Sequence, residues 1–167
     1  MESSPLKPNL YIETSVISYF TARPSRDLIV VARQRITYEW WEVALPFFEA
    51  HISPVVLEEI SRGNLEAASK RRKAVASFPL LEVIPEVRDL AEVYFTKISI
   101  PEKSRADTYH LALATWHGMD YLVSWNCRHI AGAGVRRRVE EINAVEGIRT
   151  PTICTPEELM EVGNVCG

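Results

Sequence analysis

The stretch ADTYHLALATWHGMDYLVSWN, residues 106–126, decides how this chain folds. Residues 104–117 are apolar nearly all round a helix, which predicts a buried helix, and Gly118 is the kind of residue at which such a helix ends. Residues 120–124 then form a short apolar run that predicts a strand. A buried helix followed directly by a strand is a repeating unit of α/β folds.

The rest of the chain alternates in the same way. Further strands are predicted at residues 9–12, 50–53, 80–84 and 152–154. Further helices are predicted at residues 14–20, 24–49 with a bend or end at Pro46, 54–63, 65–73, 86–98 and 135–145, and after the capping box of residues 155–158. Such alternation implies a central, mainly parallel sheet with helices on both faces. We therefore expect an α/β fold with three layers, α/β/α.

Length and composition favour one domain over residues 1–167, with a core at about 8–154 and a C-terminal helix at about 155–163. Three widely spaced cysteines without a C-x-x-C pair argue against a disulfide framework or a zinc ribbon. The first residues lack a signal-peptide pattern, and no run is long enough to span a bilayer. We expect a cytoplasmic protein that does not bind membranes.

The net charge of −3 argues against a general nucleic-acid coat protein. It does not exclude an enzyme that handles nucleic acid through local basic patches, because carboxylates in an active site lower the total charge.

Four oxygen-bearing side chains lie where a parallel sheet gathers its ligands, outside the carboxyl ends of the strands. Glu13 and Asn126 follow predicted strands, whereas Glu59 and Asp107 lie near the starts of predicted helices. A fold that brings them together makes a small oxygen-rich pocket. That chemistry suits a hard divalent cation and a phosphate ester.

The second segment contains two glutamates, of which Glu59 is expected to face inward. Glu59 is four residues after Val55 and shares its helix face, whereas Glu58 groups with Arg62. A half-buried carboxylate without a partner is costly unless something binds it. The structural alternative is an ion pair between Glu59 and Arg62 or another basic residue.

The other three also have structural explanations. Glu13 would interact favourably with the dipole of the following helix, and Asp107 would complete a capping box with Ser104. Asn126 would be an ordinary turn residue. Function is favoured for Asp107, because the helix that it begins is too apolar to lie at the surface.

The histidines give no metal motif. His110 and His117 lack the i, i+4 spacing of a metal pair, and H-E-x-x-H is absent. His129 follows Arg128 and could touch a phosphate, although a packed or capping role is favoured. No G-x-S-x-G serine and no glycine-rich phosphate loop occur.

Taken in order, four segments resemble the signatures of PIN-domain ribonucleases, and specifically the VapC-like toxins of bacterial type II toxin–antitoxin systems. The segments are YIETSV at 11–16, SPVVLEEI at 53–60, DTYHLALA at 107–114 and SWNCRH at 124–129. Each motif alone is weak, but four in the right order are fairly specific. The resemblance covers about residues 10–153.

The resemblance implies a PIN-like fold and a metal-dependent endoribonuclease that hydrolyses RNA phosphodiester bonds. Glu13, Glu59 and Asp107 would hold Mg²⁺ or Mn²⁺, and Asn126 would complete the coordination or orient a water. Residues expected to hydrogen-bond to these ligands or to contact RNA are Thr14, Ser15, Ser124, Arg105 and Arg128. Because clustered carboxylates repel one another, at least one is expected to have a raised pKa.

The resemblance also implies partners, namely a cognate antitoxin whose tail covers the site and a second copy of the chain. The predicted long helix, with Trp40, Trp41, Phe47 and Phe48, is a candidate partner surface, although core packing explains much of its apolar character.

Two departures from the family pattern keep alternatives open. Glu13 stands where the family has an aspartate, and Asn126 replaces what is an aspartate in many relatives. A PIN-like module that binds RNA or protein without catalysis is one alternative. A PIN nuclease that acts on single-stranded DNA is the other.

Overall fold

A computed structural model describes residues 6–160 of the chain. Four parallel strands form one sheet in the order β2-β1-β3-β4. They are β1 (Asn9–Ile12), β2 (Glu49–His51), β3 (Tyr121–Val123) and β4 (Thr152–Cys154). The predicted α/β class is confirmed, and every strand pair of this sheet is parallel.

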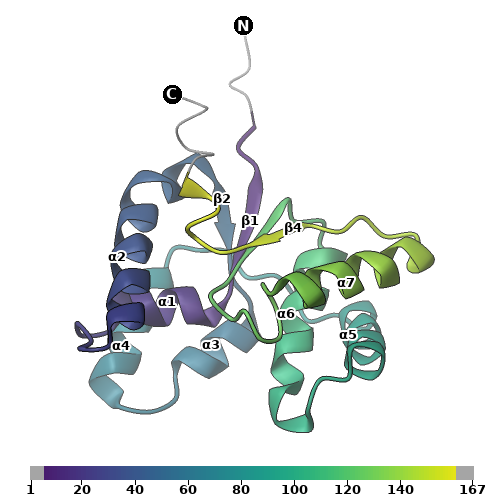
Figure 1. Cartoon of the computed structure of the whole chain (residues 1–167), viewed down its shortest axis with the longest axis horizontal. Helices are drawn as coiled ribbons and strands as arrows, with labels where there is room; N and C mark the ends of the chain where they lie inside the picture. Colours follow the sequence, from purple (N-terminus) through teal and green to yellow (C-terminus); the bar gives the residue numbers. More distant parts are fainter. Residues whose placement is uncertain (1–5, 161–167) are drawn as a thin grey trace, which may run out of the picture.

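Helices lie on both sides of the sheet (Figure 1). One side carries α1 (Thr14–Thr21), α2 (Leu28–Val43) and α4 (Leu65–Val75), and the other carries α5 (Pro85–Ile98), α6 (Arg105–Trp116) and α7 (Ala133–Glu146). The short helix α3 (Pro54–Ile60) contacts α1, α4 and α6 and so joins the two helical layers. The three-layer arrangement is therefore as expected.

Local sequence sets where the long helix begins and ends. The Asp27 carboxylate accepts hydrogen bonds from the backbone N–H groups of Ile29 and Val30, so α2 begins after Asp27 and not at residue 24. It ends at Val43, and Pro46 lies in the following 3₁₀ turn, Leu45–Phe47. The predicted break at Pro46 is confirmed, whereas the predicted extent of 24–49 was too long.

The predicted strand at 80–84 is wrong. Only Leu80 pairs, in an isolated parallel bridge with Ile52, and Leu81 N donates to Ile52 O at 2.8 Å. Pro54 begins α3 two residues after Ile52, so no backbone remains beside residues 82–84 with which they could pair. Val83 and Ile84 are instead half-buried residues that pack against the core just before α5.

The core extends over both faces of the sheet, and α6 contributes much of it on one face. Residues 110–115 of α6 are all buried, as the apolar helix pattern predicted, whereas Trp116 is 42% exposed. Trp40 and Phe48 are also buried in this core. Core packing therefore accounts for these two aromatic residues of the candidate partner surface.

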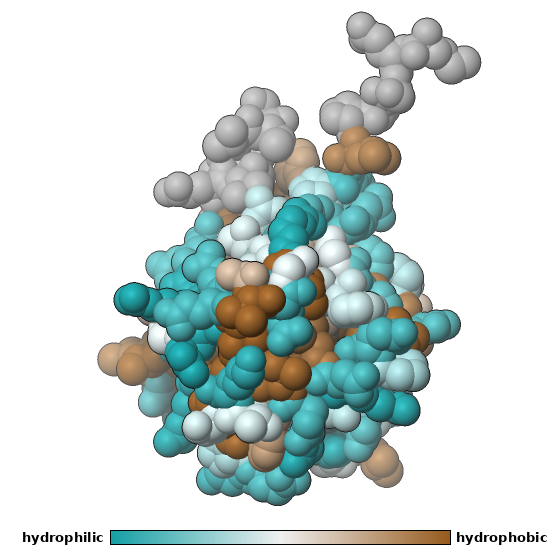
Figure 2. Space-filling model, turned by 90° about the vertical axis from the view of Figure 1, so that its right-hand side faces the viewer, coloured by the Kyte–Doolittle hydropathy of each residue, from teal (hydrophilic) through white to brown (hydrophobic). Residues whose placement is uncertain are grey.

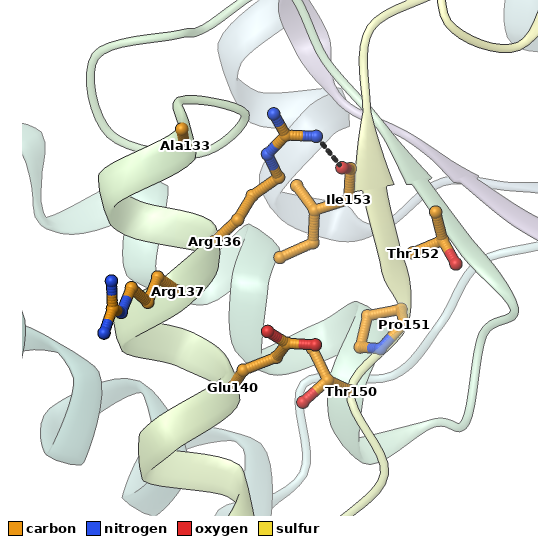
Figure 3. Close-up of a pocket in the computed structure, with 8 residues that line it drawn as sticks. All are labelled: Ala133, Arg136, Arg137, Glu140, Thr150, Pro151, Thr152 and Ile153. Carbon is orange, nitrogen blue, oxygen red and sulfur yellow. Dashed lines mark hydrogen bonds between the residues drawn. The ribbon is translucent and has the colours of Figure 1, made fainter.

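The edge strand β4 is covered in part by an arginine from α7 (Figure 3). Arg136 Nη1 donates to Ile153 O at 3.2 Å and also lies 3.1 Å from Glu158 Oε2. A strand edge normally presents unpaired carbonyl groups to solvent. Arg136 satisfies one of them, beside an open hollow of about 610 Å³ between α7 and β4.

The chain after β4 has the predicted capping box. Thr155 N donates to Glu158 Oε1 at 3.0 Å, and Glu158 N donates to Thr155 Oγ1 at 3.4 Å. Residues 161–163 of the expected C-terminal helix lie outside the described residues. Within residues 6–160, no helix combines the length and the apolar character needed to cross a membrane.

Candidate functional site

Glu13 lies at the carboxyl end of β1, where it caps α1. Its backbone N–H donates to Val123 O at 3.1 Å, which fixes Glu13 beside the end of β3. One carboxylate oxygen, Oε2, accepts from Ser15 N at 2.5 Å, and the other, Oε1, accepts from the Ser124 hydroxyl at 2.9 Å. Only 3% of Glu13 is exposed, so these donors are what stabilises its charge.

Burial raises the pKa of Glu13 above its ordinary value of 4.5, although His110 and the hydrogen bonds from Ser15 and Ser124 oppose that rise. The expectation that one carboxyl group of the site titrates high is confirmed. The main cause is loss of water and not repulsion between carboxylates.

Glu59 points inward from α3, as its position on the helix predicted. Its Oε1 accepts from the Thr14 hydroxyl at 2.8 Å and from His110 Nε2 at 2.5 Å. Arg62 instead pairs with Glu58 at 2.8 Å, so the basic partner of Glu59 is His110 and not Arg62. Burial opposes ionisation, but the bonds from His110 and Thr14 outweigh it and hold the pKa of Glu59 below its ordinary value.

His110 lies in α6, 1% exposed, with both ring nitrogens engaged. Nε2 contacts Glu59, and Nδ1 lies 2.7 Å from the Tyr11 hydroxyl. Burial lowers the pKa of His110, but the bond to Glu59 and the charges of Glu13, Glu59 and Asp107 more than offset this and raise it overall. The three predicted carboxylates thus all act on one imidazole.

Asp107 is held by a histidine and not by a helix cap. Its Oδ2 lies 2.9 Å from His129 Nδ1, and Ser104 makes no side-chain capping bond to α6. The capping-box explanation of Asp107 is therefore wrong. His129, for which a capping or packed role was favoured, orients a predicted site carboxylate.

Asn126 organises the loop after β3. Its side-chain oxygen accepts from His129 N at 3.0 Å, and its own N–H donates to Ser124 Oγ at 2.9 Å. The turn role expected of Asn126 is present. The loop then returns so closely that a Cβ on Gly132 would lie 2.1 Å from Cys127 O, so this position requires glycine.

The two arginines expected to contact RNA differ in their surroundings. The Arg105 guanidinium lies 2.7 Å from Glu92 and 2.8 Å from Glu102, and 3.8 Å from the centre of the Phe95 ring. Arg128 is exposed, forms no salt bridge within residues 6–160, and lines an open hollow of about 430 Å³ beside α7. Arg128 is thus the better placed to bind a phosphate.

Whether a metal ion fits here depends on the donor atoms that these side chains leave free. As the side chains stand in residues 6–160, no group of three or more His, Cys, Asp and Glu is arranged to hold a metal ion. Mg²⁺, however, is often held by one or two carboxylates, with waters and substrate phosphates completing the shell. Oε2 of Glu59 and Oδ1 of Asp107 accept no hydrogen bond from the described residues, so each keeps an oxygen of the kind that such a site uses.

The four predicted ligand residues are therefore linked, although each also has a structural role. Thr14, the residue after Glu13, and His110, one helical turn after Asp107, both bond to Glu59. Asn126 holds the loop that carries His129 to Asp107. The assignment of all four residues as metal ligands stays a prediction.

The sequence reasoning missed His110 and Tyr11. A signal was present, since His110 follows Asp107 by three residues and so shares its face of a helix that is otherwise apolar. A buried imidazole at that position requires polar partners.

No protein-family model matches this chain. A search of curated proteins likewise returns no relative.

Proposed function

We propose that this protein is a metal-dependent endoribonuclease with a PIN-like fold, the toxin of a toxin–antitoxin pair. The observation that carries the proposal is that Glu59 is bonded both to Thr14, the residue after Glu13, and to His110, one helical turn after Asp107. Glu13 and Thr14 directly follow β1, at the carboxyl end of a strand in the parallel sheet. Clustered carboxylates at that position suit a divalent cation and a phosphate ester.

In this proposal Glu59 and Asp107 hold Mg²⁺ or Mn²⁺ through the oxygens that accept no bond from the described residues. When bound, the ion supplies Lewis acidity to the scissile phosphate and lowers the pKa of a water that it holds. Glu13 fixes the relative position of β1 and the Ser124 loop. Arg128 binds a phosphate beside the scissile one, which would orient the RNA chain.

The proposed partners are a cognate antitoxin and a second copy of the chain. Support for an interface comes from the surface. The face on the side of α5 and α7 has an apolar area at its centre, surrounded by hydrophilic residues (Figure 2). Apolar areas with a polar rim are typical of protein interaction sites.

The test is cleavage of a structured RNA by the purified chain in Mg²⁺ or Mn²⁺, beside the Asp107→Asn variant and with matched single-stranded DNA. The Arg137→Ala variant serves as a control, because Arg137 is exposed on α7 and its ion pair is with Glu141. We expect RNA cleavage by the wild type and by the control, and little by Asp107→Asn. Equal cleavage by all three would contradict the site.

A second candidate function is an inert PIN-like module that binds RNA or a protein. The observation that favours it is that the described side chains form no cluster of three metal-binding groups. RNA binding by a folded wild type that cleaves neither RNA nor DNA would support this candidate. Cleavage of DNA alone would support a nuclease for single-stranded DNA.

A further inference from the structure

A chain of side-chain hydrogen bonds runs from the core to the site. The Ser53 hydroxyl lies 2.8 Å from the Tyr11 hydroxyl, which lies 2.7 Å from His110 Nδ1. His110 Nε2 then contacts Glu59 Oε1 at 2.5 Å. Ser53, Tyr11 and His110 are all buried, so this polar chain crosses the interior and reaches solvent only near Glu59.

The direction of the last bond is fixed by chemistry. An ionised carboxylate only accepts hydrogen bonds, so the Nε2–H of His110 donates to Glu59. Thr14 donates to the same oxygen from α1 at 2.8 Å. Two donors from different elements therefore hold Oε1 of Glu59, while Oε2 accepts no bond from any residue between 6 and 160.

A role in stability alone does not account for this series of buried hydrogen bonds. Polar groups buried in a core cost free energy unless all of them are satisfied, and an apolar side chain of similar size is often at least as stable. The neighbours of His110 on α6, Leu111 and Leu113, are buried apolar residues of this kind. Ser53 is already used as the cap of α3, and Tyr11 links that cap to the imidazole.

We propose that His110 is a positioning residue, which fixes the Glu59 carboxylate so that its Oε2 faces the cation. Tyr11 and Ser53 hold the imidazole in the required orientation. The inference rests on the proposed metal-dependent function. It assigns no contact between His110 and either the ion or the RNA.

Two substitutions of His110 distinguish the contribution of its Nε2, which contacts Glu59, from that of its Nδ1, which contacts Tyr11. The amide nitrogen of glutamine lies as many bonds from Cα as Nε2 does, so His110→Gln keeps a donor for Glu59. The amide group of asparagine ends where Nδ1 lies, so His110→Asn keeps only the contact with Tyr11. Both variants replace the imidazole by a neutral amide, and their thermal stabilities are compared first.

The measurement is the affinity for Mn²⁺, read from the electron paramagnetic resonance of free Mn²⁺. We expect His110→Gln to bind within about threefold of the wild type and His110→Asn to bind roughly 10- to 100-fold more weakly, as for other residues that orient a metal ligand. Tyr11→Phe removes the hydroxyl beside Nδ1, and we expect its affinity for Mn²⁺ to lie between those of the two His110 variants. Equal affinities of the two His110 variants would overturn the inference while leaving the metal site in place.

Failure of the proposed function gives a different result. If the wild type binds no Mn²⁺, the metal site is wrong, and positioning is then read without metal from the ¹³C chemical shift of the Glu59 carboxyl carbon. A shift that moves in His110→Asn but not in His110→Gln would support the role of His110. A shift that moves equally in both variants would overturn it.

Discussion

The Ser124 hydroxyl donates a hydrogen bond of 2.9 Å to Glu13 Oε1, although the two residues are 111 positions apart. The bond joins the ends of β1 and β3, and Ser124 Oγ also accepts from Asn126 N. One hydroxyl therefore ties a buried carboxylate to the loop that carries the rest of the site.

Ser124→Ala is expected to destabilise the protein by about 1–3 kcal/mol, because it leaves a buried carboxylate oxygen without its donor. The measurement is urea unfolding. Ser77→Ala, at an exposed serine whose side chain makes no hydrogen bond within residues 6–160, is the control and should change little. Equal losses in both variants would contradict the role of Ser124.

The stability of the wild type relative to Glu13→Gln should depend on pH. Burial raises the pKa of Glu13 in the folded protein above the ordinary value of 4.5, so the folded state binds this proton more tightly than the unfolded state does. The free energy of unfolding contributed by Glu13 therefore falls as pH rises from 4.5 through the raised pKa and is constant above it. The change is about 1.4 kcal/mol for each unit by which the pKa is raised.

The measurement is urea unfolding of both proteins over that pH range. The wild type should lose stability relative to Glu13→Gln as pH rises. Curves that stay parallel across the range would show that Glu13 is ionised as readily in the folded protein as in the unfolded chain.

Two glycines near the start of α7 make a matched pair. A Cβ at Gly132 would collide with Cys127 O, whereas a Cβ at Gly134 would meet nothing within 4 Å. We expect Gly132→Ala to cost about 1–3 kcal/mol and to lower RNA cleavage, because the loop that carries Asn126 and His129 must move. Gly134→Ala should be neutral or slightly stabilising, since alanine favours a helix. Thermal unfolding and cleavage assays would detect a reversal of this order.

His129 should act on cleavage through Asp107. His129→Ala removes the donor 2.9 Å from Asp107 Oδ2 and should lower kcat/KM roughly 10- to 100-fold. His129→Asn keeps a nitrogen near the position of Nδ1 and should retain activity within a few-fold. If both variants lose activity equally, His129 acts through its other nitrogen.

The Cys154 thiol should be inert while the protein is folded. Burial raises its pKa to about 12, and only the thiolate reacts readily. In a protein carrying Cys127→Ser and Cys166→Ser, we expect Ellman's reagent to react roughly a thousandfold or more slowly than in guanidinium chloride, because only unfolded molecules are accessible. Rapid reaction of the native protein would contradict the position of Cys154 in the core.

Much of the fold follows from local sequence. The strand of residues 9–12 and the buried helix after Arg105 have patterns set by their own residues, and the structure agrees with both within about a residue. The strand predicted at 80–84 failed for a reason that lies elsewhere in the chain. Leu80 of that stretch pairs with Ile52, and α3 begins two residues later. A local pattern does not show whether a partner strand continues.

The site was predictable only where local spacing decides which way a side chain faces. Spacing on a helix identified Glu59 over Glu58, because both belong to one short helix. The bonds from His110 to Glu59 and from His129 to Asp107 join positions 51 and 22 residues apart. Such pairs follow from tertiary packing, so the partner of each carboxylate had to be seen in the structure.

The contact between Arg136 and the Ile153 carbonyl has a consequence for how copies of this chain meet. The guanidinium occupies a carbonyl group that another chain's strand would otherwise bond to at this edge of the sheet. Addition of strands at open sheet edges is how fibrils grow. If copies of the chain associate at this end of the molecule, we therefore expect contact between side chains of helices and not pairing of strands.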